Sequence, residues 1–183
     1  MVFEMQRNTD LRHATPLPWW LFMLPMIFSA AVRDLWAPDE PRYAEVAKEI
    51  FEHGSVLVMH LCGQLYPDKP PLLFWLSGFA GKLSHWSEFA MRWPSLLATF
   101  LTAWMIIIFA RRWWGELEAR WAPIFFLSSA MVAEIGGRLQ IDPLLTALGT
   151  GALLLAGTEF SSSRKRSAAL NGAGLLTGIG ALA

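Results

Sequence analysis

The sequence has little charge and almost no cysteine, and both shortages exclude classes of protein. Asp, Glu, Lys and Arg make up 16% of the 183 residues, against about 25% in soluble domains. Positive and negative side chains balance at 15 each, so no basic surface predicts a nucleic-acid partner. Cys62 is the single cysteine and can form no internal disulfide. We therefore expect no nucleic acid and no disulfide-stabilised domain.

Apolar residues, in contrast, are abundant. They form 54% of the chain and include ten Trp and twelve Phe, and Trp is enriched where a chain meets a bilayer surface. Ala14–Val32 contains no charged residue, which predicts a first membrane span. A cleaved signal peptide is the alternative, but Glu4 and Asp10 cancel the positive region that such a peptide needs. The sequence predicts an all-α polytopic membrane protein.

A spanning helix needs about 20 mostly apolar residues. The fifth apolar segment stops at the end of the sequence without a polar flank, so we expect this chain to be the N-terminal part of a longer one. Residues 1–16 would be a cytoplasmic N-terminus, and 17–183 an incomplete membrane domain. The expected spans are about 17–33, 94–110, 120–137, 143–158 and 168–183.

Basic clusters predict the topology, because cytoplasmic loops carry an excess of Lys and Arg. The apolar stretch 70–83 is short for a span. If it does not cross, all the basic clusters lie on the cytoplasmic side, and residues 34–93 form a loop on the outer face. These clusters consist of Arg7, Arg12, Arg111, Arg112, Arg120, Arg164, Lys165 and Arg166.

The outer loop is predicted to contain two interfacial helices, over about 41–53 and 70–83. In the first, apolar residues recur at helical spacing on one face and charged residues occupy the other. Gly54 follows as a natural helix end.

Three polar clusters on the predicted outer face could carry chemistry. Each has a plain structural alternative: helix capping for Asp39, Glu40 and Asp142, and reaching for lipid headgroups for Lys69. The clusters read Asp39-Glu40-Pro41-Arg42-Tyr43, Tyr66-Pro67-Asp68-Lys69-Pro70-Pro71-Leu72 and Arg138-Leu139-Gln140-Ile141-Asp142-Pro143.

Taken together, the three clusters resemble one family of membrane enzymes. Their order is similar to that in the polyprenyl-phosphate-sugar-dependent glycosyltransferases, of the protein O-mannosyltransferase and aminoarabinose lipid A transferase type. The family's Lys-Pro-Pro-Leu run followed by an aromatic residue and Trp here reads Lys69-Pro70-Pro71-Leu72-Leu73-Phe74-Trp75, and its Arg-x-Pro-Ser motif reads Arg92-Trp93-Pro94-Ser95. The resemblance implies a C-type glycosyltransferase fold.

The resemblance also implies a reaction and its participants. A sugar would pass from a polyprenyl-phosphate-linked donor to lipid A, a protein or a glycan, at the outer or periplasmic face of the inner membrane. Asp39 matches the family's motif acid and would be the catalytic base. Lys69 and Arg42 would bind the donor phosphate. The remaining expected site residues are Asp142 as a second catalytic acid, with Glu40, Tyr43 and Arg138 in substrate binding.

Other interpretations stay open at this stage. Asp68, Glu40 and His60 could supply ligands for a divalent metal, but no metal-ligand spacing is present and no cofactor is expected with certainty. A transporter or channel fragment would need charged residues inside the spans, and only Glu134 comes close. A non-catalytic membrane scaffold from a truncated transferase gene is the third alternative.

Overall fold

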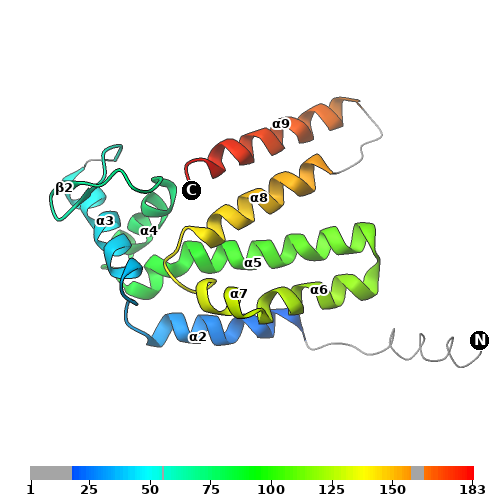
Figure 1. Ribbon diagram of the computed structural model, residues 1–183, viewed down its shortest axis with the longest axis horizontal. Helices are drawn as coiled ribbons and strands as arrows, with labels where there is room; N and C mark the ends of the chain where they lie inside the picture. Colours follow the sequence, from blue (N-terminus) through cyan, green and yellow to red (C-terminus); the bar gives the residue numbers. More distant parts are fainter. Residues whose placement is uncertain (1–17, 55, 158–162) are drawn as a thin grey trace, which may run out of the picture.

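The computed structural model describes residues 18–54, 56–157 and 163–183, and the predicted cytoplasmic N-terminus lies outside them. Lengthwise helices form one part of the molecule and a small group of elements gathers at one end (Figure 1). The lengthwise elements are the 3₁₀ helix η1 (Trp19–Met23), α2 (Leu24–Val32), α5 (Glu88–Trp113), α6 (Glu116–Ser128), α7 (Ala130–Ile135), α8 (Asp142–Ala156) and α9 (Ser163–Gly180).

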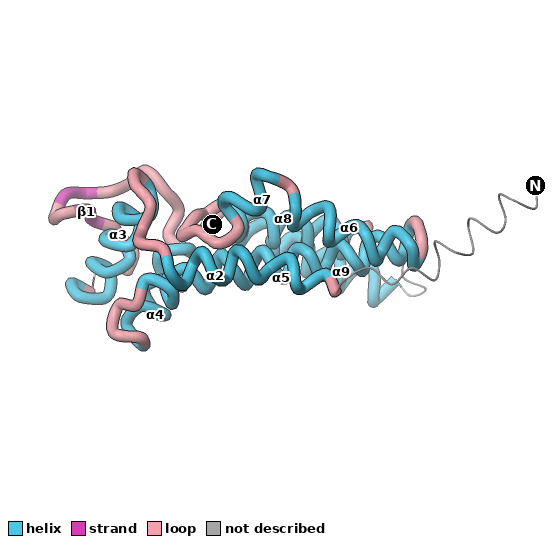
Figure 2. Tube along the Cα trace, turned by 90° about the horizontal axis from the view of Figure 1, so that it is seen from below, coloured by secondary structure: helices cyan, strands magenta, loops and turns pink. Residues whose placement is uncertain are grey.

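The end group comprises α3 (Asp39–His53), α4 (Leu72–Leu83) and a two-stranded antiparallel hairpin, β1 (His60–Leu61) and β2 (Gln64–Leu65). Figure 2 shows α3, α4 and the hairpin together at the end of the bundle away from the α5–α6 turn. The hairpin was not predicted from the sequence. It is tied to α3 because the Glu49 carboxylate accepts a hydrogen bond from the Gly63 N–H at 3.3 Å.

The helix α5 is the longest of the described helices in the bundle. Among the described helices it alone is both long and apolar enough to cross a membrane, and half of its most apolar window is buried inside the protein. It begins at Glu88, six residues before the predicted span, so that Arg92 lies within the helix. Shorter apolar helices occupy Trp19–Val32, Leu72–Leu83 and Asp142–Ala156.

One predicted span is interrupted. The segment 120–137 was expected to be continuous, but α6 ends at Ser128 and α7 begins at Ala130, with extended backbone at Ser129 (ψ 137°). The Ser128 and Ser129 hydroxyls donate to the carbonyls of Ile124 and Phe126, at 2.6 and 2.9 Å. Such bonds compete with the helical pattern and favour a break.

The apolar face of α3 is buried against protein. Tyr43, Val46 and Ile50 pack with Leu73 and Phe74 of α4 in one core cluster. The helices approach so closely that a Cβ at Gly78 would lie 2.6 Å from the Ala47 carbonyl oxygen. Gly54 ends α3 with φ +72°, the left-handed cap predicted from the sequence. The end group is therefore a packed unit with α3 held firmly on α4.

Candidate functional site

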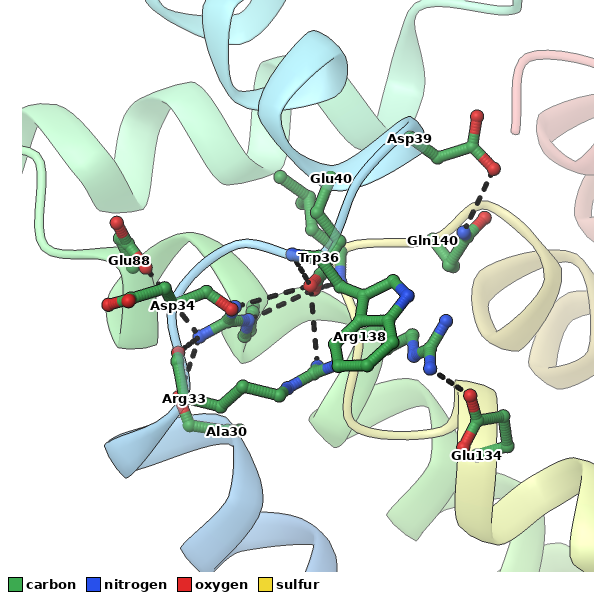
Figure 3. Close-up of polar contacts among 12 residues, drawn as sticks. Ala30, Arg33, Asp34, Trp36, Asp39, Glu40, Glu88, Glu134, Arg138 and Gln140 are labelled. Carbon is green, nitrogen blue, oxygen red and sulfur yellow. Dashed lines mark hydrogen bonds and ion pairs between the residues drawn. The ribbon is translucent and has the colours of Figure 1, made fainter.

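The site is organised around a buried ion pair between α3 and α5. Glu40 and Arg92 are 1% and 0% exposed, and Arg92 Nε donates to Glu40 Oε1 at 3.0 Å. Arg92 also donates to the main-chain carbonyls of Ala30, Arg33 and Asp34, at 2.8 to 2.9 Å. One guanidinium thus holds the end of α2, the loop after it and the start of α3. Figure 3 shows the dashed lines of this network converging on the Glu40 carboxylate.

Glu40 extends the same connection to the loop before α8. Its carboxylate accepts from the Leu139 N–H at 2.8 Å and from the Trp36 N–H at 2.7 Å, and it pairs with Arg33 at 3.3 Å. Burial alone would raise the pKa of Glu40, but the hydrogen bonds from Arg92, Leu139 and Trp36 outweigh it and lower the pKa below its ordinary value. Both carboxylate oxygens are therefore occupied by protein groups, an arrangement that favours a supporting role over the substrate contact expected from the sequence.

Two further polar side chains of α5 hold the loop before α8. Ser95 Oγ donates to the Gln140 carbonyl at 3.0 Å, and Thr99 Oγ1 donates to the Gly136 carbonyl at 3.0 Å. Arg92, Ser95 and Thr99 are spaced three and four residues apart, so they share one face of α5. This polar stripe fixes both loops that carry the predicted catalytic acids.

Asp39 lies at the start of α3, next to Glu40. One oxygen pairs with Arg42 Nη2 at 2.5 Å, and the other accepts from Gln140 Nε2 at 3.5 Å. Pro38 occupies the cap position of α3, and no side-chain hydrogen bond caps the helix. The Asp39 side chain is 36% exposed and is therefore accessible to a substrate.

Tyr43 links Asp39 to Asp142, the exposed first residue of α8. Burial raises the pKa of the Tyr43 phenol, the negative charges of Asp39 and Asp142 add to the rise, and Arg42 opposes it. Both acids are thus within electrostatic range of the same hydroxyl. Asp39 and Arg42 are in direct contact, and Asp142, from a segment about 100 residues further along, lies within electrostatic range of Tyr43.

Lys69 completes this group through Tyr66. Burial raises the pKa of the Tyr66 phenol, with Arg42 and, more weakly, Lys69 pulling it down. The Tyr66 hydroxyl is buried and has no hydrogen-bond partner in the described part of the chain. Lys69 is exposed and precedes α4 by three residues, outside the helix as predicted. The sequence places Tyr66 in the second polar cluster but does not single it out as a site residue.

Arg138 belongs to the loop before α8 and lies against Trp36, in the loop before α3. It pairs with Glu134, and its guanidinium lies 5.3 Å from the centre of the Trp36 ring. Arg92 was noted only as part of a motif and not as a site residue. The signal that could have identified it was an arginine at the edge of an apolar helix, where an unpaired charge would be costly.

A metal site was left open from the sequence. Within residues 18–54, 56–157 and 163–183, no three His, Cys, Asp or Glu side chains gather as metal ligands. In particular, Glu40 is fully engaged with protein groups.

Comparison with known proteins points to a single family. Residues 68–183, more than half of the chain, match the model of the dolichyl-phosphate-mannose-protein mannosyltransferases. The chain is 34% identical over 163 residues to the undecaprenyl phosphate-alpha-4-amino-4-deoxy-L-arabinose arabinosyl transferase of Edwardsiella ictaluri, covering 87% of this chain and 30% of the relative. The transferase of the same name from Aeromonas salmonicida is 36% identical over 126 residues, covering 68% and 23%.

Solved structures show the same fold. The crystal structures of ArnT from Cupriavidus metallidurans, in the apo state and bound to undecaprenyl phosphate, superpose with TM-scores of 0.80 and 0.81. The identity is 24% in both, over 88% of this chain and about a third of theirs. The chain thus spans about a third or less of the length of its relatives.

Proposed function

Because the chain belongs to the dolichyl-phosphate-mannose-protein mannosyltransferase family, we propose that it is the part of a glycosyltransferase that moves a sugar from a polyprenyl-phosphate-linked donor to an acceptor. The observation that carries this proposal is the position of Asp39. Its side chain is 36% exposed and is held between Arg42 and Gln140, and Arg42 and Lys69 both act electrostatically on the Tyr66 phenol. An oriented acid beside cations is what transfer from a phosphate leaving group requires.

Lys69 and Arg42 bind the phosphate of the donor. As the bond between the anomeric carbon and the phosphate oxygen breaks, the polyprenyl phosphate leaves with the electron pair and negative charge grows on it. Cations aimed at that charge stabilise the transition state. Lys69 makes no ion pair or hydrogen bond within the described part of the chain and is exposed, so its ammonium is available to a ligand.

Asp39 serves the acceptor. The acceptor oxygen forms the new bond to the anomeric carbon, and its proton passes to the Asp39 carboxylate when the acceptor is a hydroxyl. Asp142 and Tyr43 border this position and orient the substrates. Lipid A, a protein and a glycan are the acceptors to be distinguished. The relatives' names make undecaprenyl phosphate-alpha-4-amino-4-deoxy-L-arabinose the first donor to test.

The proposed setting is the inner membrane, crossed several times, with the site on the outer or periplasmic face. The arrangement of the helices supports this placement. The site elements α3 and α4 lie at one end of the bundle, whereas Arg111, Arg112 and Arg120 lie at the α5–α6 turn at the other end. A short α4 that stays with α3 at one end is consistent with a helix that does not cross.

Asp39→Asn tests the proposal. Asn keeps the size and the contact to Gln140 but removes the basicity, and loss of a general base typically costs about 10²–10⁴ in rate. Membranes containing the complete gene product are supplied with the polyprenyl-linked donor, and transfer to each acceptor is measured. Glu45→Gln is the matched control, because Glu45 is an exposed acid on the same helix. Near-normal transfer by Asp39→Asn would show that the base is another group.

A further inference from the structure

The loop before α8 is held at Gln140 by a serine of α5. The Ser95 hydroxyl donates to the Gln140 carbonyl at 3.0 Å and accepts from the Gln140 N–H at 3.3 Å. Ser95 is fully buried, so both bonds lie in a low-dielectric environment, where hydrogen bonds are stronger. Both main-chain polar groups of Gln140 are thus satisfied by α5, and its side chain is left to make other contacts.

The Gln140 side chain contacts the proposed base. Its Nε2 donates to Asp39 Oδ2 at 3.5 Å, and Figure 3 shows the amide beside that carboxylate. An ionised carboxylate only accepts hydrogen bonds, so the amide must present its nitrogen to Asp39. The bond is longer than the usual range of about 2.7–3.2 Å. Catalytic hydrogen bonds are often long in a free enzyme and tighten when the substrate binds.

This contact is not needed to hold the two segments together, because the neighbouring pair already does so. The buried Glu40 carboxylate accepts from the Leu139 N–H at 2.8 Å. Gln140, in contrast, is partly exposed. Its amide can exchange the bond to Asp39 for one to water, so the contact adds little stability. Of the two contacts that bridge these segments, the buried one joins the loops and the exposed one acts on Asp39.

The two carboxylate oxygens of Asp39 have unlike partners. Oδ1 pairs with the Arg42 guanidinium at 2.5 Å, whereas Oδ2 receives, within the described residues, only the neutral amide of Gln140. Charge-assisted hydrogen bonds are about twice as strong as neutral ones, so the charge on Oδ2 is less compensated than the charge on Oδ1. Oδ2 is therefore the oxygen suited to take a proton. An amide orients it without neutralising it, as a lysine or arginine at position 140 would.

We propose that Gln140 is a positioning residue, whose amide aims Asp39 Oδ2 at the acceptor during sugar transfer. This inference rests on the proposed function, with Asp39 as the base. The side chain at position 140 then changes the rate of the chemical step and not the binding of either substrate. Both its length and its N–H are required. Met keeps the length without the donor, and Glu keeps the shape but places a negative charge where the donor stood.

The test compares variants of the complete protein in nanodiscs. Gln140→Met should lower kcat by about 10²-fold, the cost of a catalytic group displaced by about 1 Å. The acceptor KM, the affinity for undecaprenyl phosphate and the melting temperature should keep their wild-type values. Adding Gln140→Met to Asp39→Asn should cost no further activity, because residues that act as a unit are not additive. A purely structural role would lower kcat in either background.

Gln140→Glu adds a pH dependence that the positioning role predicts. With both carboxylates ionised, the new charge repels Asp39, and kcat should fall at least as far as in Gln140→Met. At lower pH the two carboxyls share one proton, and a protonated Glu at position 140 donates its O–H to Asp39. The kcat of the variant relative to the wild type should therefore rise as the pH falls from about 8 to about 5. The other charged groups at this position are the same in both proteins: Arg42 beside Asp39, and Arg138 and Asp142 within two residues.

Gln64→Met is the matched control, because Gln64 is an exposed glutamine of β2, and it should transfer sugar like the wild type. Four results would overturn the proposal: a wild-type kcat in Gln140→Met, a further loss on the Asp39→Asn background, an acceptor KM that rises while kcat holds, or a fall in melting temperature that accompanies the loss of activity. If Asp39→Asn itself transfers at the wild-type rate, the proposed base and this inference fail together. If only Gln140→Met does so, the inference fails alone.

Discussion

Replacing Arg92 with lysine tests how far the site depends on one side chain. The Arg92 guanidinium makes five hydrogen bonds, three to carbonyls of residues 30–34 and two to the Glu40 carboxylate. Lysine offers three donors from a single nitrogen, so at least two of these five bonds, all to buried or partly buried acceptors, are lost. At about 1–3 kcal/mol for each, we expect Arg92→Lys to lose about 2–6 kcal/mol of stability.

Sugar transfer should be slower even in those Arg92→Lys molecules that remain folded. Glu40 bonds the Leu139 N–H, and Leu139 directly precedes Gln140, the loop residue whose amide donates to Asp39. A displacement of about 1 Å in a catalytic group can cost about 10²-fold in rate. Arg92→Lys should therefore lower kcat more than it weakens the binding of undecaprenyl phosphate, because Lys69, one of the two proposed phosphate ligands, lies outside both α3 and α5.

The assay is thermal unfolding of the purified protein in nanodiscs, followed by circular dichroism, with transfer measured on the same samples. Arg92→Met leaves Glu40 without its main partner, a change that costs about 3–5 kcal/mol in buried pairs. The double variant Arg92→Met/Glu40→Gln should lose less than the sum of the two single variants, by about 0.5–3 kcal/mol. Additive losses, or an Arg92→Lys protein that melts and turns over like the wild type, would refute the reasoning.

Lys69→Arg and Lys69→Ala should both abolish transfer, and Lys82→Ala should be nearly silent; full activity of Lys69→Arg would make Lys69 an interchangeable anchor. Because the pKa of Glu40 is lowered, its stabilising contribution is complete above the ordinary value of 4.5 and is lost as the pH falls through the lowered value. The difference in melting temperature between wild type and Glu40→Gln should therefore narrow below pH 4.5. A difference that stays constant would show that the Glu40 carboxylate is not the source of this pH-dependent stability. Gly78→Ala should lower the stability by about 1–3 kcal/mol, because its Cβ would lie 2.6 Å from a backbone oxygen of α3. Gly149→Ala is the control, since its Cβ would meet nothing within 4 Å. Equal melting temperatures of the two variants would contradict the close packing of α3 on α4.

Much of the fold could be predicted from the sequence, because helices in a chain this apolar follow from composition and periodicity. Helices occur near every predicted segment within the described residues, and the family resemblance is confirmed. Other features depend on tertiary contacts. At the break near Ser129, the Ser128 and Ser129 hydroxyls donate hydrogen bonds to main-chain carbonyls. The hairpin is held by a hydrogen bond from the Gly63 N–H to the Glu49 carboxylate. Neither pairing leaves a periodic signal in the sequence.

The candidate site was predictable only as a set of residues. Motif order selected Asp39, Arg42, Tyr43, Lys69 and Asp142. In the structure Asp39, Arg42 and Asp142 act on the Tyr43 phenol, and Arg42 and Lys69 act on the Tyr66 phenol. Motif order could not separate neighbours with different functions. Asp39 and Glu40 are adjacent acids at the start of one helix, but one side chain is exposed and the other is buried against Arg92. Burial decides between substrate contact and support, and burial is a property of the fold.

The polar stripe on α5 also supports one half of the site, the half that contains Asp39 and Asp142. The loops before α3 and before α8 are both fastened to Arg92, Ser95 and Thr99, so the carboxylate half of the site is attached to that one helix. Lys69 has a separate support, since the first N–H of α4 donates to the Leu182 carbonyl beyond α9, at 2.7 Å. The two halves meet mainly where α3 rests on α4. The acids and the lysine are thus held by different helices, and the close packing of α3 on α4 sets how far apart they lie.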